Sequence, residues 1–281
     1  MISRALFVGI DRYRPRDCQV PNLGGCVGDM RLMHSTMTEV FGTSLQNVET
    51  LTDADATTSN LIAAIEGLVA GVRQGQVGFL YYAGHGGQVP NADRTADDPE
   101  DYDQILVPHD FSMTEPLLDD MLHAWLSRIP DGGKLVAILD SCHSGGMPRA
   151  PMSVEECRSR QDEGWQSRSI GVIPRAAYTP KQLQALGDLK KRFKVEGANE
   201  SFVLLAAAQD DESAWERDFG DGKHGIFTYH VCEALRERGS AATPIELVDY
   251  AYAKIMGYRE NQMPRLTGLE KFFRKPLFDV R

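Results

Sequence analysis

The feature that most constrains the fold is a regular alternation of short apolar runs with amphipathic helical patterns. The run ALFVGI at 5–10 precedes helical spacing of apolar residues over 27–41, and VETLTD at 48–53 precedes a second helical pattern over 57–75. A third run, VGFLYYAGHG at 77–86, is apolar through its tyrosines, which is typical of a strand covered on both faces. This alternation predicts an α/β fold, with a doubly wound, mostly parallel central sheet flanked by helices.

The second half of the chain continues this pattern around a long interruption. From about 145 to 199 the sequence is rich in Pro, Arg, Lys, Ser and Glu. A stretch of this length without a convincing core element predicts an exposed linker. The elements expected in this half are a helix over 118–130, a strand over 134–142, a weak helix over 181–193, a strand over 201–209, and helices over 225–237 and 244–257.

Composition excludes several classes of function. The net charge of −10 argues against a nucleic-acid partner, because phosphate binding needs clustered Lys and Arg, and it suits basic ligands better. No run of 18 apolar residues and no signal-peptide pattern is present, so neither membrane insertion nor secretion is expected. The five cysteines form no CxxC pair, which favours a reducing, cytoplasmic setting over a disulfide scaffold.

Two short motifs place a histidine and a cysteine at the carboxyl ends of predicted strands. YYAGHG carries His85, and LDSCHSG carries Cys142. Ligands of doubly wound sheets bind beyond these strand ends. A nucleophilic cysteine needs a base to form its thiolate, and backbone N–H groups of Gly86, Gly145 and Gly146 can stabilise an oxyanion. Either residue alone would more often be structural, but together they predict a cysteine peptidase.

With several further segments, these motifs resemble a prokaryotic type I metacaspase-like protein, a cysteine peptidase of the caspase-haemoglobinase fold. The histidine upstream of the cysteine has the order of a caspase-type site, although the local cysteine motif differs. By this resemblance His85 and Cys142 form the catalytic dyad. The segments that carry it are ALFVGIDRY, NLGGCVGDM, FLYYAGHGGQ, DYDQILVPHDF, LVAILDSCHSGG, FVLLAAAQDDESAWE, HGIFTY and NQMPRLTG. The resemblance implies one caspase-like domain over 1–281, with a large-subunit-like part at 1–146, a linker at 147–199 and a small-subunit-like part at 200–281.

The resemblance also implies cleavage after Arg or Lys, the P1 residue, whose side chain metacaspases hold with carboxylates in the S1 pocket. The matching positions are Asp29 and Asp140, and Cys26 lines the same region. A carboxylate binds a guanidinium through two hydrogen bonds, and a negative cleft concentrates cationic substrates. Taken alone, Asp29 indicates only an acid at a helix N-terminus, and Asp140 a strand-end residue. Family members carry a Ser where this chain has Ala83, a departure that concerns fine specificity.

Many type I metacaspases need calcium, which aspartates near the substrate cleft bind. The matching positions are Asp103, Asp119 and Asp120, which are hard oxygen ligands of the right type. A further family aspartate after the nucleophile is absent from GGMPRAP, where Arg149 stands. Asp119 and Asp120 could equally cap a helix, so calcium activation and a capping role both stay open.

Cleavage within the linker is expected to produce the active form, either by the protein itself or by an upstream activating protease. The expected partners are that protease and protein or peptide substrates with Arg or Lys at P1. A protease with a pocket for basic residues finds several in the linker. The candidates are Arg149, Arg158, Arg160, Arg168, Arg175, Lys190, Lys191 and Arg192.

Two other functions remain open on the sequence. One is an enzyme of the same fold with another P1 preference, such as a separase-like or CHAT-type peptidase, which Asp29 and Asp140 disfavour. The other is a catalytically idle caspase-fold module that serves a signalling or defence complex. A generic α/β hydrolase or dinucleotide binder is disfavoured, because neither GxSxG nor GxGxxG follows the first strand.

Overall fold

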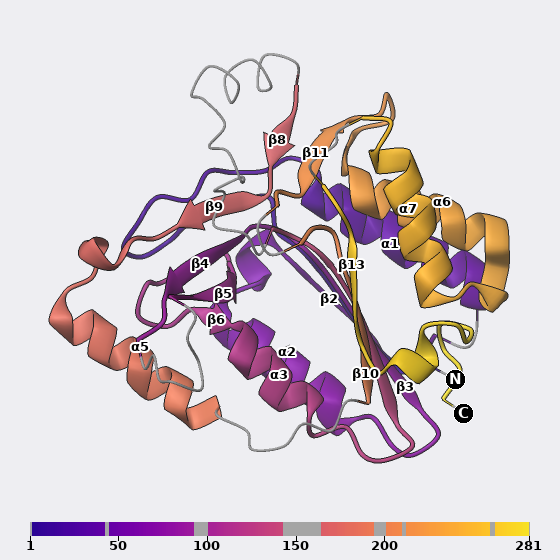
Figure 1. The fold of residues 1–281 in the computed structure, drawn as a ribbon, viewed down its shortest axis with the longest axis horizontal. Coiled ribbons are helices and arrows are strands. Elements are labelled where there is room, and N and C mark those ends of the chain that lie inside the picture. The colour runs from indigo at the N-terminus through magenta and orange to yellow at the C-terminus, as the bar shows by residue number, and fades with distance from the viewer. Residues whose placement is uncertain are drawn as a thin grey trace.

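The predicted mostly parallel sheet is confirmed. The computed structural model describes residues 2–42, 45–92, 101–142, 164–193, 201–209, 212–258 and 262–280. Within them a six-stranded sheet has the order β13-β10-β7-β3-β1-β2, and only the β10–β13 pair is antiparallel (Figure 1). Its strands are β1 (Ile2–Gly9), β2 (Val48–Thr52), β3 (Val77–Ala83), β7 (Lys134–Asp140), β10 (Phe202–Ala206) and β13 (Arg265–Gly268).

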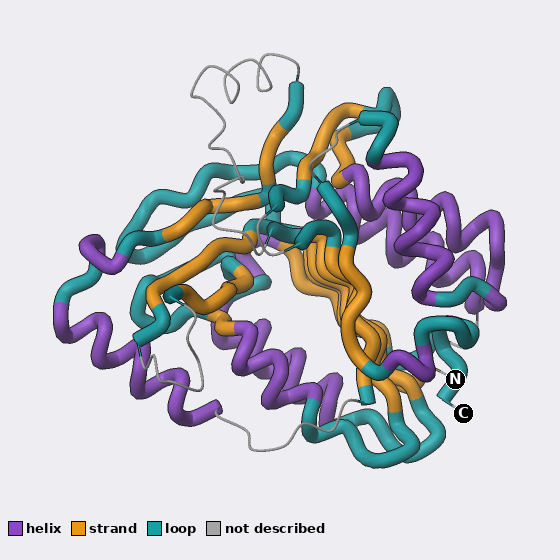
Figure 2. The backbone as a smooth tube through the Cα atoms, in the orientation of Figure 1, coloured by secondary structure: helices purple, strands orange, loops and turns teal. Residues whose placement is uncertain are grey.

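Helices cover both faces of this sheet (Figure 2). The helices α1, α6 and α7 pack together on one face, and α2 and α3 cover the other. Each of the expected helical stretches coincides with one observed helix. Because helices cover both faces of the sheet, the central strands β3 and β7 are buried along their whole length. The helices are α1 (Cys26–Phe41), α2 (Thr58–Ala70), α3 (Asp119–Leu126), α5 (Pro180–Phe193), α6 (Ile226–Arg238) and α7 (Pro244–Ile255). None of the helices in these described ranges is long and apolar enough to cross a membrane.

Local side chains fix where two of these helices begin. Thr243 and Glu246 form a capping box at the start of α7. At the start of α1, the carboxylate of Asp11 accepts hydrogen bonds from the backbone N–H groups of Cys26 and Val27, at 2.8 and 3.2 Å. A negative group is favourable at this helix end. Asp11 follows β1, so the contact ties the N-terminus of α1 to the carboxyl end of the sheet.

Two small sheets lie beyond the carboxyl ends of the central strands. One has the order β6-β5-β4-β9, and the other has the order β12-β11-β8. β8 and β9 come from the segment expected to be an exposed linker, and their two and four residues are too short for periodicity to predict. The strands are β4 (Gly86–Pro90), β5 (Tyr102–Leu106), β6 (Leu117–Leu118), β8 (Gln166–Ser167), β9 (Ser169–Val172), β11 (Trp215–Asp218) and β12 (Lys223–Gly225).

The linker expected over 147–199 is only partly exposed where the structure describes it. Trp165 and Leu186 are buried, and the side chain of Arg168 is fully buried. The helix α5 packs against α3 at the edge of the molecule (Figure 1). Composition hides this arrangement, because an arginine is normally exposed unless partners compensate its charge. Residues 143–163 and 194–200 lie outside the described part, so the exposure expected there stays a prediction.

Candidate active site

His85 and Cys142 lie just beyond the carboxyl ends of two neighbouring parallel strands. The register of β3 and β7 pairs Ala83 with Asp140, and each candidate follows two residues later. Both side chains are fully buried. Pairing of β3 with β7 therefore brings together two residues that are far apart in the sequence.

The contacts of His85 define which of its ring nitrogens can act as a base. Nε2 lies 2.9 Å from the backbone carbonyl oxygen of Pro21, so this nitrogen carries the proton. Among the described residues Nδ1 has no hydrogen-bond partner. Burial lowers the pKa of His85 to about 4, against the opposing effect of the carbonyls of Pro21 and Arg168. The imidazole is thus neutral, with Nδ1 able to accept a proton.

The thiol of Cys142 is held by the backbone of Ala214 rather than by His85. Its Sγ accepts a hydrogen bond from the N–H group at 2.8 Å and donates one to the carbonyl oxygen at 3.3 Å. Burial raises the pKa of Cys142 to about 12, so the thiol is protonated in this state. Within the described residues, no hydrogen bond joins Cys142 to His85.

Next to this thiol, a backbone carbonyl lies between two N–H donors. The carbonyl oxygen of Arg168 accepts hydrogen bonds from the backbone N–H groups of Gly86, at 3.0 Å, and Cys142, at 3.3 Å. The backbone N–H of Arg168 donates to the carbonyl oxygen of Ala214 at 2.9 Å. Gly86 tolerates no side chain, because a Cβ there would lie 1.8 Å from the Cys142 carbonyl oxygen. Two converging N–H groups beside a thiol have the geometry of an oxyanion hole.

The guanidinium of Arg168 lies in a pocket of three carboxylates. It forms ion pairs with Asp29, with Asp140 at 3.1 Å and with Glu216 at 3.2 Å, and all four side chains are fully buried. The opposite wall is Gly225, where a Cβ would lie 2.3 Å from Asp140 Oδ2 and 2.6 Å from Arg168 Nη1. The structure thus brings Asp29 and Asp140 together around one basic side chain.

Hydrogen bonds from neighbouring groups orient the two predicted carboxylates. Asp29 Oδ1 lies 2.7 Å from His224 Nδ1, and Oδ2 accepts the N–H of Gly225 at 2.8 Å. Burial works against a charge on His224, but Asp29 outweighs it and raises the pKa of that imidazole. Asp140 accepts the N–H of Thr228 at 3.1 Å and also its hydroxyl. Burial raises the pKa of Asp140, while the charge of Arg168 acts in the opposite direction.

Glu216 is the pocket residue that sequence reasoning missed. It lies in β11, and its Oε1 accepts the N–H of Gly24 at 3.0 Å while Oε2 faces Arg168. Cys26, expected to line the pocket, is buried, and its Sγ lies 3.9 Å from Glu216 Oε2. The only sequence signal was an acid in the short run AWERD, next to a tryptophan. Burial raises the pKa of Glu216, as it does for Asp140.

Two of the three aspartates expected to bind calcium, Asp103 and Asp120, contact an ammonium group. Lys190 of α5 lies with its Nζ 2.6 Å from Asp103 Oδ1 and 3.5 Å from Asp120 Oδ2. Burial, with the charges of Asp120 and Asp103, raises the pKa of Asp119 to about 7. A group of three or more His, Cys, Asp or Glu residues placed to hold a metal does not occur among the described residues. In this arrangement Lys190 holds one oxygen of Asp103 and one of Asp120, so a calcium ion at those two atoms would have to displace it.

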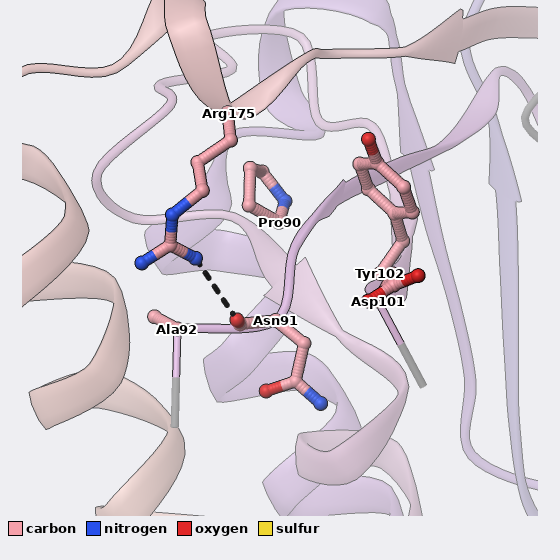
Figure 3. Close-up of a pocket in the computed structure, with 6 residues that line it drawn as sticks. All are labelled: Pro90, Asn91, Ala92, Asp101, Tyr102 and Arg175. Atoms are coloured by element: carbon pink, nitrogen blue, oxygen red, sulfur yellow. Dashed lines mark hydrogen bonds between the residues drawn. The ribbon is translucent and has the colours of Figure 1, made fainter. Parts of the chain in front are cut away.

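The other basic residues of the linker lie elsewhere. Arg175 lies at a separate cavity of about 470 Å³ and donates to the Asn91 carbonyl oxygen at 3.3 Å (Figure 3). Lys191 and Arg192 are exposed on α5. Arg168 alone among the described candidates lies against Cys142. The candidates Arg149, Arg158 and Arg160, and the glycines Gly145 and Gly146, lie outside the described residues.

Comparisons with known proteins agree on one family. The model of the metacaspase, peptidase C14 domain matches residues 3–151. The chain is similar to Metacaspase-1 of Pyricularia oryzae, with 26% identity over 262 residues that cover 83% of this chain and 63% of that protein. It is also similar to Metacaspase-1A of Aspergillus terreus, with 32% identity over 262 residues that cover 83% and 62% of the two proteins. The chain thus spans less than two thirds of the length of these relatives.

A solved structure supports the fold. The crystal structure of protein GSU0716 from Geobacter sulfurreducens superposes with a TM-score of 0.70, covers all of both chains and is 20% identical. At this identity the likeness concerns the arrangement of helices and strands.

Proposed function

Since this chain belongs to the metacaspase, peptidase C14 family, we propose that it is a cysteine endopeptidase that cleaves peptide bonds after Arg or Lys. The observation that carries the proposal is the position of Arg168. Its guanidinium lies among three buried carboxylates, while its carbonyl oxygen accepts two backbone N–H bonds beside the thiol of Cys142. A P1 residue needs this combination, with its side chain in a specificity pocket and its carbonyl next to the nucleophile.

The proposed reaction uses a Cys142/His85 pair. His85 Nδ1 takes the thiol proton, and Sγ attacks the P1 carbonyl carbon while the N–H groups of Gly86 and Cys142 stabilise the oxyanion. The C–N bond then breaks, and His85 gives its proton to the leaving amine. Water, deprotonated by His85, hydrolyses the thioester and releases a carboxylate. Burial causes both pKa shifts of the pair, so entry of water would move each pKa back toward its ordinary value.

The pocket favours Arg over Lys. The guanidinium of Arg168 reaches all three carboxylates, through Nη2 to Asp29, Nη1 to Asp140, and Nε and Nη2 to Glu216. A single ammonium cannot reproduce this fork, and each hydrogen bond to a charged group contributes about 1.5–3 kcal/mol. An acidic P1 residue would add a fourth buried negative charge. We therefore expect Arg to be preferred to Lys, and both to Asp or Leu.

Calcium activation, which the family resemblance implies, is a proposal separate from the reaction of Cys142 and His85. Asp103 and Asp120 are hard oxygen ligands, but Lys190 contacts one oxygen of each. Calcium would have to displace this ammonium, and with it part of α5. Cleavage of the linker by an upstream activating protease and cleavage by the protein itself both remain proposals.

The experiment that tests the proposal measures hydrolysis of fluorogenic peptides with Arg, Lys, Asp or Leu at P1. The proteins are the full chain, its Arg168→Ala variant, which empties the pocket, and the same variant with Cys142→Ala. We expect cleavage of the Arg and Lys peptides that is lost with Cys142→Ala. Equal hydrolysis without the thiol, or a preference for Asp or Leu, would refute the proposal.

A further inference from the structure

The segment around Arg168 crosses the candidate active site in an extended conformation. Before Arg168, β8 pairs antiparallel with β11, with Ser167 opposite Trp215 and Gln166 opposite Glu216. After Arg168, β9 pairs with β4, with Ser169 opposite Gly86, and the pairing continues to Val172. The segment is thus held on both sides of the Arg168 carbonyl by strands of the site, as an extended peptide substrate is held by β-augmentation.

The residues before Arg168 also contact the site through their side chains. Trp165 is buried, and the guanidinium of Arg217 lies 4.7 Å from its ring centroid. The ring of Tyr258 meets Trp165 edge-on at 6.3 Å. Gln166 Nε2 donates to the carbonyl oxygen of Asn22 at 2.6 Å. Aromatic and cation–π contacts of this kind contribute specificity in addition to the buried area.

On the other side of Arg168, the site fits the residues that follow. A Cβ at Gly87 would lie 2.5 Å from the side chain of Ile170. The absence of a side chain at Gly87 therefore leaves room for Ile170. Gln88 accepts the N–H of Ile173 through its carbonyl oxygen at 2.9 Å. Contacts on both sides of one carbonyl distinguish a bound substrate from a basic residue that only neutralises a pocket.

From these contacts we propose that Arg168–Ser169 is the bond that this protein cleaves in itself, within one molecule, and that the uncut segment blocks the pocket to other substrates. The proposal rests on the peptidase function proposed above. It also assigns a substrate class: peptides with an aromatic residue three positions before the P1 Arg, as in Trp165-Gln166-Ser167-Arg168.

Self-cleavage proceeds through a thioester between Cys142 and Arg168. Cys142 Sγ bonds to the Arg168 carbonyl carbon as its proton passes to His85, the bond to the Ser169 nitrogen breaks, and that nitrogen takes the proton. Water then hydrolyses the thioester, which regenerates the thiol and leaves Arg168 as a carboxylate. The tethered segment competes at a high effective concentration, on the order of millimolar. External peptides therefore enter the pocket only after this segment withdraws, either because it has been cut or because a substitution removes the Arg168 side chain that anchors it among the three carboxylates.

The experiment follows the full chain by intact mass and N-terminal sequencing, as wild type and as Cys142→Ala, Arg168→Gln and Arg192→Gln. Arg192 is exposed on α5 and serves as the matched control. We expect wild type and Arg192→Gln to yield one new N-terminus at Ser169, and Cys142→Ala and Arg168→Gln to yield none there. The first-order rate should not change over a ~100-fold range of protein concentration, because tethered groups react within one molecule. A rate that rises with concentration, or a first cut elsewhere, would overturn the proposal.

A second measurement separates this proposal from the peptidase function. Arg168→Gln is assayed on fluorogenic peptides ending in Trp-Gln-Ser-Arg and Ala-Gln-Ser-Arg. We expect both to be hydrolysed, with kcat/KM about 10-fold higher for the tryptophan peptide. If Arg168→Gln hydrolyses these peptides but wild type never cuts at Ser169, the peptidase function stands and the self-cleavage proposal fails. If the two peptides are hydrolysed equally, the assigned substrate class fails. If no Arg peptide is hydrolysed by any form, the function itself fails, and the self-cleavage proposal with it.

Discussion

Removal of Arg168 should destabilise the uncut protein strongly, and an arginine ligand should restore that stability. The change is Arg168→Ala, made in the Cys142→Ala chain so that no cleavage interferes. It leaves Asp29, Asp140 and Glu216 buried without their common countercharge. Breaking a buried ion pair by removing one partner costs about 3–5 kcal/mol. We expect the free energy of unfolding to fall by about 3–5 kcal/mol. The fall is smaller where protonation of the buried carboxyls removes part of their uncompensated charge.

The pH dependence of this loss has a defined sign. Burial already raises the pKa values of Asp140 and Glu216, and loss of the arginine charge raises them further. Folded carboxyls with raised pKa values hold protons that the unfolded chain releases, so their contribution to stability is present at low pH and is lost as pH rises through the folded pKa values. The variant should therefore regain stability as pH falls from neutral toward the ordinary range of carboxyl groups.

The assay is urea unfolding followed by circular dichroism, with and without N-acetyl-arginine amide. A ligand at 100 times its dissociation constant stabilises the folded state by about 2.7 kcal/mol, and the uncharged citrulline analogue should give much less. Arg192→Ala, on the exposed face of α5, is the matched control and should change stability by less than about 0.5 kcal/mol. Wild-type stability for Arg168→Ala, or equal rescue by the citrulline analogue, would refute the account of the pocket.

Three further changes probe the pocket and the acidic cluster. Glu216→Gln removes the charge from the acceptor of two guanidinium hydrogen bonds, and we set the loss at about the 1.5–3 kcal/mol of one hydrogen bond to a charged group. This should lower kcat/KM for Arg peptides roughly 10- to 150-fold and should reduce the ratio of kcat/KM for Arg over Lys peptides. Unchanged steady-state rates would contradict this. Gly225 has an ordinary φ of −64°, but a Cβ at this position would lie 2.3 Å from Asp140 Oδ2. In Gly225→Ala, hydrolysis of Arg peptides should therefore fall while the circular dichroism spectrum stays native. Normal hydrolysis would show that the pocket is formed differently. Lys190→Met removes the ammonium group that holds Asp103 Oδ1, so this variant should bind calcium in a calorimetric titration, whereas the uncut chain with Lys190 should not. Equal calcium binding by the two proteins would show that Lys190 does not compete with the ion.

The sheet could be predicted because its signals are local. β3 and β7 are continuous apolar runs, and the helices that cover them carry clear periodicity, so element order and parallel pairing follow. Parallel pairing in turn places residues that follow neighbouring strands at one edge, which is why His85 and Cys142 lie close together.

The resemblance implied Asp29 and Asp140 in the pocket, but the presence of Arg168 and Glu216 there could not be predicted, because it depends on distant contacts of charged residues. Nothing local distinguishes Arg168 from the exposed Arg192, and its burial depends on carboxylates from α1, β7 and β11 that converge only in the fold. Glu216 lies in a four-residue strand, too short to reveal its inward face. Lys190 is one of several basic residues on α5, and only its orientation toward Asp103 sets it apart.

Selective capture of an arginine side chain next to the thiol of Cys142 can be measured by the mass of the Arg168→Ala chain after treatment with an arginyl chloromethyl ketone, compared with the leucyl chloromethyl ketone. We expect one adduct, on Cys142, with the arginyl reagent and little or none with the leucyl reagent, because only a guanidinium forms ion pairs with Asp29, Asp140 and Glu216. Equal labelling by the two reagents, or an arginyl adduct on another cysteine such as the part-exposed Cys18, would contradict it.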